Sequence, residues 1–161
     1  MSMLMLTGEY EHTIDEKNRL FISNKLRSQI DTEQYGSDFF LAMGPNGILS
    51  IYPEKYFQQI AFGGGAEAGA PDESVAYERL SFALANKVEL DRQGRLLINE
   101  KLRKRARLGI SLTLVGVRDH IEVWNTEDWE RYLSDNLDFY QSQVAQARQD
   151  QIRRQSREID S

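Results

Sequence analysis

Two stretches of the chain place an arginine four residues after an aspartate. The first reads DEKNR from Asp15 to Arg19, and the second reads DRQGR from Asp91 to Arg95. A carboxylate at this spacing can orient a guanidinium, whose remaining donors are free to bind phosphate or the O6 and N7 atoms of guanine. The repeated pair therefore indicates contact with duplex DNA. The alternative is that each pair only holds the shape of its own loop.

Both stretches lie between two predicted strands and should form tight loops. Asn18 and Gly94 stand at equivalent loop tips, and both residue types adopt positive φ readily. Such loops are small enough to enter a major groove, as β-ribbon readers do. The candidates for DNA contact are Lys17, Asn18, Arg19, Arg92 and Arg95, and the residues expected to shape the loops are Asp15, Asp91 and Gly94.

The loops belong to a longer internal repeat. Residues 12–30 align without gaps to residues 88–106, with 7 of 19 positions identical, and the similarity continues after a shift of four residues. Each copy would be roughly 50–60 residues long, and a unit of that size rarely buries enough apolar surface alone. The repeat therefore predicts two copies that share one core as a pseudo-twofold pair.

Each copy predicts the same elements. Alternation of apolar and polar residues indicates a strand at 10–14 and another at 20–22, followed by a short helix capped by Ser23 or, in the second copy, Asn99. Gly109 is the expected stop of the second of these helices. Hairpins are expected at 39–52 and 111–124, and a helix should begin near Pro53 and near Thr126.

The chain is thus expected to contain a first unit (1–60), a glycine-rich acidic linker (61–76), a second unit (77–133) and a C-terminal helix with a polar tail (134–161). The glycines 63–65 lack the Gly-Lys-Ser/Thr of a phosphate loop, so a linker is the better interpretation. Leu133, Leu137, Tyr140 and Val144 recur at helical spacing. That stripe fits either packing on the same chain or a subunit contact, and the last dozen residues are expected to fray.

Composition narrows the function further. The net charge is −5, yet the segment from Asp91 to Arg107 holds seven basic and two acidic residues. This segment could steer a polyanion to one face, or it could be a solvated helix face. There are no cysteines, which excludes disulfides and thiol chemistry, and no apolar run approaches a membrane span. We expect no cofactor, no metal and a cytoplasmic protein.

Enzymatic interpretations are weaker. Asp15 and Asp91 could form a carboxylate dyad, but the arginine beside each would keep it ionised. His12 shares a strand face with apolar residues and is expected to be packed, and His120 beside Asp119 is a weak metal signal. We therefore expect a protein that is not an enzyme.

The sequence resembles the MraZ family of bacterial transcriptional regulators over about residues 4–133, which include both Asp-Arg loops. The resemblance rests on Gly8-Glu9-Tyr10, Ile14-Asp15 with Lys17 and Arg19, the loop 91–95, Leu114-Val115-Gly116 and Ile121-Glu122-Val123-Trp124. It implies an α+β, mainly β fold, in which two tandem AbrB-like units form a pseudo-twofold swapped-hairpin β-barrel with short flanking helices and a C-terminal helix.

The resemblance also implies a nucleoid-associated, ring-shaped homo-oligomer that binds direct repeats in double-stranded DNA. These repeats would lie upstream of the division and cell-wall gene cluster that includes its own gene. It gives Arg19 the central contact and Lys17 the basic position beside it. Asn18 replaces the family's usual glycine, which could alter base preference. The alternative function is an oligomeric scaffold or antitoxin-like partner binder.

Overall fold

The computed structural model describes residues 3–62 and 72–161, in two units: Met1–Thr126 and Glu127–Ser161. The predicted linker falls mostly on residues 63–71, outside the described part. The elements of the first unit are β1 (Glu9–Thr13), β2 (Arg19–Phe21), α1 (Asn24–Arg27), α2 (Thr32–Tyr35), β3 (Phe39–Met43), the 3-10 turn η1 (Pro45–Gly47), β4 (Leu49–Pro53), α3 (Glu54–Phe62), α4 (Asp72–Ala83), β5 (Asn86–Val88), β6 (Arg95–Leu97), α5 (Glu100–Arg105), β7 (Ser111–Val117) and β8 (His120–Asn125). The helix α6 (Thr126–Asp160) follows.

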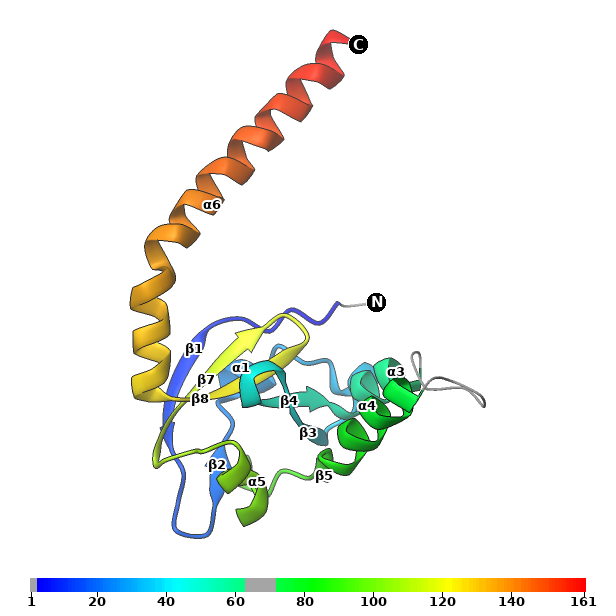
Figure 1. Ribbon diagram of the computed structural model, residues 1–161, viewed down its shortest axis with the longest axis vertical. Coiled ribbons are helices and arrows are strands. Elements are labelled where there is room, and N and C mark those ends of the chain that lie inside the picture. Colours follow the sequence, from blue (N-terminus) through cyan, green and yellow to red (C-terminus); the bar gives the residue numbers. More distant parts are fainter. Residues whose placement is uncertain (1–2, 63–71) are drawn as a thin grey trace. The chain divides into compact units, whose positions relative to one another are not determined.

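The two copies of the repeat exchange their first strands. One sheet has the order β1-β7-β8-β4-β3-β5 with antiparallel neighbours, and β2 pairs with β6 in a second, two-stranded ribbon (Figure 1). The first copy therefore places β1 on the hairpin β7–β8, and the second copy places β5 on the hairpin β3–β4. The predicted α+β, mainly β class and the swapped hairpins are confirmed.

The strand registers show the pseudo-twofold directly. In the ribbon, Leu20 lies opposite Leu96, its own equivalent in the repeat. In the large sheet, Ile51 lies opposite Ile121 and Leu49 opposite Val123, which is the symmetric register for two copies offset by 72 residues. Residues from both copies form one hydrophobic cluster, so neither copy has a core of its own.

The helix caps follow the sequence in part. Ser23 accepts a hydrogen bond from the Lys25 N–H, and Asn99 accepts one from the Leu102 N–H at 2.8 Å, as predicted. The expected stop at Gly109 is wrong, because the helix α5 ends two residues before Arg107, which takes the left-handed conformation at φ 56°. The Arg107 N–H donates to Lys104 O and the Leu108 N–H to Arg103 O, each at 3.1 Å, so the turn closes without a glycine.

The C-terminal helix is longer than the sequence suggested. The helix α6 begins at Thr126, as predicted, but it continues to Asp160, so the expectation of a frayed tail is wrong. Its polar part is rich in Gln and Arg, which favour helix, and pairs such as Gln146 Nε2 to Asp150 Oδ1 at 3.1 Å lie one turn apart. None of its residues is buried. Among the described residues, no helix has both the length and the hydropathy to cross a bilayer.

Candidate nucleic-acid interface

The first Asp-Arg loop is a closed hydrogen-bonded turn. Asp15 Oδ1 accepts from the backbone N–H groups of Lys17 and Arg19, each at 2.9 Å. Asp15 Oδ2 accepts from Arg19 Nε at 2.7 Å. The Asn18 N–H donates to Asp15 O at 3.0 Å, and Asn18 has φ 61°. One aspartate thus fixes both the backbone of the loop and the direction of the arginine.

The second loop repeats this geometry. Asp91 Oδ1 accepts from the N–H groups of Gln93 and Arg95 at 2.9 Å, and Asp91 Oδ2 accepts from Arg95 Nε at 2.9 Å. Gly94 takes the place of Asn18 with φ 80°. The predicted tight loops, their positive-φ tips and the pairing of aspartate with arginine inside each loop are therefore all present.

The same hydrogen bonds keep both carboxylates ionised. The backbone N–H of Arg19 has the largest effect in lowering the pKa of Asp15 below its usual value, and the N–H of Arg95 does the same for the pKa of Asp91. Burial opposes the shift, and the guanidinium side chains add to it. Each aspartate is therefore a fixed negative anchor at neutral pH.

The ribbon β2–β6 brings the two arginines to one surface. Arg19 lies opposite Leu97 and Arg95 opposite Phe21, while the central Leu20–Leu96 pair points into the core. Side chains alternate along a strand, so these four flanking residues share the outer face. Arg95 Nη1 is 3.7 Å from Asp15 Oδ2, so Asp15 lies near both guanidinium groups.

Arg19 and Arg95 differ in how many of their terminal nitrogens are free to bind a ligand. The Arg19 side chain is 33% exposed, and its terminal nitrogens have no polar partner among residues 3–62 and 72–161. The Arg95 side chain is 28% exposed, and its terminal nitrogens face Asp15 and Gln93 Oε1, the latter at 3.4 Å. Arg19 is thus the freer of the two. Lys17 and Arg92 are exposed at the edges of their loops.

An arginine of the other copy lies against each loop tip, which the sequence analysis missed. Arg103 Nη1 donates to Asn18 Oδ1 at 2.6 Å, although the two residues are 85 positions apart. On the other side, a Cβ added at Gly94 would lie 2.8 Å from the guanidinium carbon of Arg27. The Asn18 side chain is therefore engaged within the protein. Arg27 and Arg103 are identical positions of the repeat, and that identity was the available signal.

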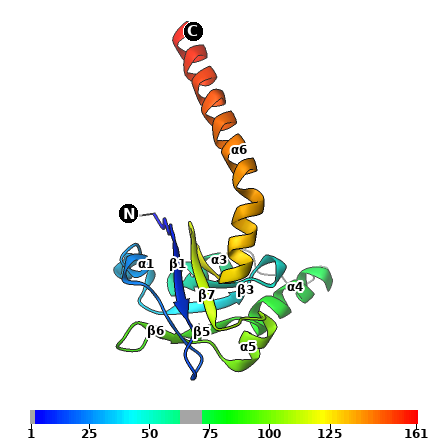
Figure 2. The same cartoon turned by 90° about the vertical axis from the view of Figure 1, so that its left-hand side faces the viewer.

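Leu97 is a second residue that the sequence analysis did not select. This residue is 54% exposed and lies opposite Arg19 on the outer face of the ribbon. An apolar group at a DNA-facing surface can contact the methyl group of thymine. Figure 2 shows β6 and the turn that leads into β2 at the end of the folded unit away from the N-terminus.

The two histidines lie in different environments. His12 packs edge-on against Phe21 with ring centroids 5.4 Å apart, and burial lowers its pKa, as expected for a packed strand residue. His120 Nδ1 is 2.8 Å from Asp119 Oδ1, and its Nε2 is 3.5 Å from Glu122 Oε2. No set of three His, Asp or Glu side chains among the described residues is arranged to hold a metal ion.

Comparison with known proteins identifies the family. A family model described as "MraZ protein, putative antitoxin-like" matches residues 5–64 and 81–152, which is most of the chain. The chain belongs to the MraZ family. The match includes both Asp-Arg loops, both hairpins and the first part of α6.

Similar MraZ proteins match at about one third identity. A protein of Clostridium tetani is 34% identical over 137 residues, covering 85% of this chain and 93% of that protein. One of Carboxydothermus hydrogenoformans is 35% identical over 128 residues, covering 80% of this chain and 86% of that protein. One of Moorella thermoacetica is 34% identical over 138 residues, covering 86% and 93%. Each is named "Transcriptional regulator MraZ".

Proposed function

We propose that this chain is a transcriptional regulator that reads double-stranded DNA through the outer face of the ribbon β2–β6. The observation that carries the proposal is the state of Arg19. Its Nε is fixed to Asp15, while neither terminal nitrogen has a polar partner in the described residues and the side chain is one third exposed. A guanidinium held this way has two parallel donors for guanine O6 and N7, or for a phosphate.

The other loop residues take supporting roles in this proposal. Lys17 and Arg92 are exposed beside the arginines and suit contacts to phosphates. Arg95 contributes a second, weaker contact, because Asp15 and Gln93 already occupy its terminal nitrogens. Asp15, Asp91 and Gly94 shape the loops. Asn18 acts indirectly by fixing the first loop to Arg103.

Binding at direct repeats by a ring-shaped homo-oligomer completes the proposal. Several weak contacts on one assembly raise the effective concentration of each loop at the next repeat. The apolar residues Leu137, Tyr140 and Val144 of α6 are exposed and supply a surface for association between subunits. The proposed sites lie upstream of the division and cell-wall gene cluster that contains the protein's own gene.

A gel-shift titration tests the proposal. A duplex from immediately upstream of the protein's own gene is compared with a scrambled duplex of equal length, at several salt concentrations. We expect preference for the upstream duplex and a log–log salt slope of about −0.9 for each neutralised phosphate. Equal affinity for both duplexes, or binding insensitive to salt, would contradict the proposal and favour an interaction scaffold or antitoxin-like partner binder.

A further inference from the structure

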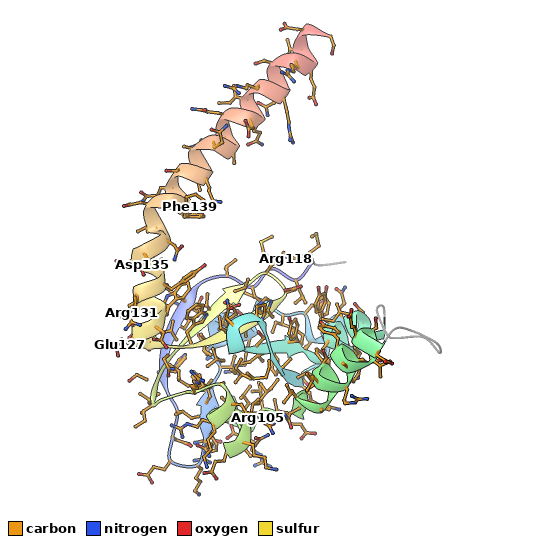
Figure 3. The ribbon with its side chains drawn as sticks, viewed as in Figure 1. Arg105, Arg118, Glu127, Arg131, Asp135 and Phe139 are labelled. Carbon is orange, nitrogen blue, oxygen red and sulfur yellow. The ribbon has the colours of Figure 1, made fainter. Side chains whose placement is uncertain are left out.

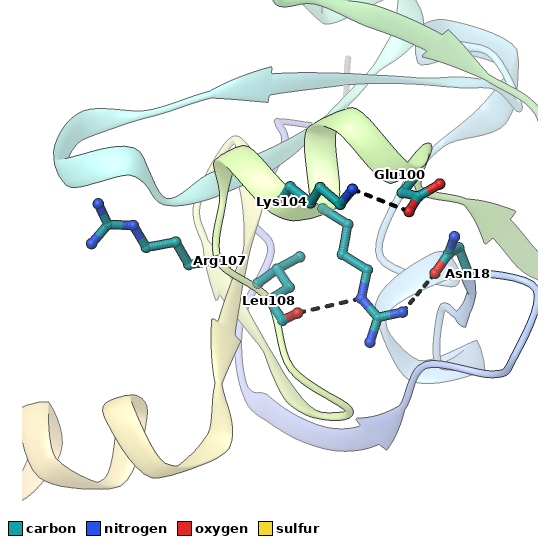
Figure 4. Close-up of a pocket in the computed structure, with 6 residues that line it drawn as sticks. Asn18, Glu100, Lys104, Arg107 and Leu108 are labelled. Carbon is teal, nitrogen blue, oxygen red and sulfur yellow. Dashed lines mark hydrogen bonds and ion pairs between the residues drawn. The ribbon is translucent and has the colours of Figure 1, made fainter.

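A basic pocket lies between the first loop and the helix α5. It has a volume of about 270 Å³. Its lining residues are Asn18, Glu100, Arg103, Lys104, Arg107 and Leu108 (Figure 4). Three of these six side chains are cationic and one is anionic. The pocket adjoins the residue next to Arg19 in the chain, so a ligand here would lie beside the proposed reading surface.

Arg103 gives the pocket a positive charge that no carboxylate of residues 3–62 and 72–161 pairs with. Its Nη1 donates to Asn18 Oδ1 at 2.6 Å, its Nη2 to Gly109 O at 3.1 Å and its Nε to Leu108 O at 3.3 Å. All three acceptors are neutral oxygens. The guanidinium is therefore held rigidly, and its charge remains available to attract an anion at short range.

Lys104 and Arg107 add two cations at the mouth of the pocket. Lys104 Nζ is 3.3 Å from Glu100 Oε1, but both side chains are well exposed, so this pair is weak. The Arg107 side chain extends away from Lys104 and Asn18 (Figure 4). It has no ion pair among the described residues. A left-handed arginine costs backbone energy that a glycine would not, yet this position carries a charge.

The corresponding place in the other copy lacks this charge. Residues 99–108 hold five basic side chains and one acidic side chain, whereas the equivalent residues 23–32 hold two and one. The positions matching Lys104 and Arg107 are Ser28 and Asp31. The pseudo-twofold relates the backbones of the two copies but not their charges, so this concentration of basic side chains is found in the second copy only.

We propose that this pocket binds a backbone phosphate of the duplex whose bases the first loop reads. Lys104 would contact that phosphate directly, Arg107 would contact the neighbouring phosphate, and Arg103 would position Asn18 and supply charge. This inference rests on the proposed function. It assigns the helix α5 and the turn after it a sequence-independent role, because phosphate contacts fix orientation but carry no base information.

The arginine at position 107 allows a test that separates binding from folding. Arg107→Gly removes the charge and also relieves the left-handed backbone, so the melting temperature should stay equal or rise. Arg118→Gly is the matched control, since Arg118 is also left-handed, at φ 61°, and exposed. Figure 3 shows Arg118 and Arg105 of α5 at opposite ends of the folded unit. Lys104→Gln is the second variant.

The readout is affinity for the upstream and scrambled duplexes across a salt series. Arg107→Gly and Lys104→Gln should each lower the affinity for both duplexes by the same factor, about tenfold at low salt. Each should make the salt slope shallower by about 0.9. Arg118→Gly should change neither quantity. Glu100→Gln, which frees Lys104 from its partner, should strengthen binding to both duplexes.

The outcomes distinguish the two proposals. If the unaltered chain binds neither duplex, the proposed function fails and this inference fails with it. If it binds and prefers the upstream duplex, but Arg107→Gly and Lys104→Gln leave the slope unchanged, only the pocket assignment is overturned. Inorganic phosphate is titrated in parallel. Saturable phosphate binding that Lys104→Gln removes, combined with an unchanged duplex slope, would point to a free-phosphate site and would also overturn the assignment.

Discussion

Leu20 lies directly opposite Leu96 at the centre of the ribbon β2–β6, and both side chains are fully buried. These residues are equivalents in the internal repeat, so the pseudo-twofold passes between them. The two loop arginines flank this pair, Arg19 one residue before Leu20 and Arg95 one residue before Leu96. The distance between the two Asp-Arg loops is therefore set by packing of the core rather than by a flexible connection.

Loss of Arg19 should affect DNA binding far more than stability. Arg19→Ala removes the outward donors, so the affinity for the upstream duplex should fall by about tenfold or more. Arg95→Ala should have a smaller effect, because Asp15 and Gln93 already engage its terminal nitrogens. Gel shifts measure affinity, while size-exclusion chromatography and thermal melting check assembly and folding. Unfolding or dissociation of Arg19→Ala would show that Arg19 is a structural partner of Asp15 instead.

Shortening the Leu20 side chain at the pseudo-twofold should destabilise both copies of the repeat together. Leu20→Ala leaves a cavity against Leu96, and the free energy of unfolding should fall by about 2–5 kcal/mol. Leu97→Ala, one residue along the same ribbon, should cost less than about 1 kcal/mol, because Leu97 is half exposed. Urea unfolding measures both. A small effect of Leu20→Ala would argue against a shared core at this position.

Gly116 should tolerate no side chain. A Cβ there would lie 2.5 Å from Thr7 N and 2.7 Å from Leu6 C, and the Gly116 N–H donates to Gly8 O at 2.8 Å. Gly116→Ala must displace the segment before β1, which should cost about 1–3 kcal/mol of unfolding free energy. Gly109→Ala is the comparison, since a Cβ there would approach one side-chain atom, Asn125 Oδ1 at 3.3 Å, and no backbone atom within 4 Å. Equal losses of unfolding free energy for both variants would contradict the close approach of Gly116 to the backbone of Leu6 and Thr7.

His120 should make stability fall as the pH rises above neutrality. Its ring lies between Glu122 and Asp119, and these carboxylates, Glu122 first, raise its pKa above the model-compound value of 6.5. A raised pKa means that protonated His120 stabilises the fold below pH 6.5, and that this contribution is lost as the pH rises through the folded-state pKa. The melting temperature should therefore drop as the pH rises above 6.5.

The other groups around His120 define the control. Tyr52 stacks on the imidazole with ring centroids 5.2 Å apart, and Tyr56 Oη donates to Asp119 Oδ2 at 2.7 Å. His12, whose pKa is lowered by burial, acts with the opposite sign and loses stability as the pH falls. The difference between the unaltered chain and His120→Gln isolates one histidine. If their pH profiles are parallel, the His120 assignment is wrong.

The sequence predicted the parts of the site that depend on neighbouring residues. Asp15 and Arg19 are four positions apart, and a turn between two alternating strands leaves their side chains few other partners. The caps at Ser23 and Asn99 follow from similar short-range rules. The exchange of β1 and β5 between the copies came only from the family resemblance, because alternation reveals a strand but not its partner.

Long-range and irregular features were missed for physical reasons. The bond between Asn18 and Arg103 joins residues 85 positions apart, and no local pattern encodes it. The helix α4 was not predicted, because its apolar residues, such as Tyr77 and Leu80, do not gather on one face and all remain exposed. At Arg107 a left-handed residue without glycine closes the turn, so the rule that favoured Gly109 selected the wrong residue.

The exchange of first strands between the copies has a consequence for biosynthesis. The strand β1 pairs with β7 in a register that joins Glu9 to Val115, so its partner is made about 100 residues later. Until then, a nascent N-terminal half exposes an unpaired strand and an incomplete core. Completion of the native sheet must therefore wait until the ribosome has released most of the polypeptide. A separately expressed half should assemble only with the complementary half or with another copy of itself.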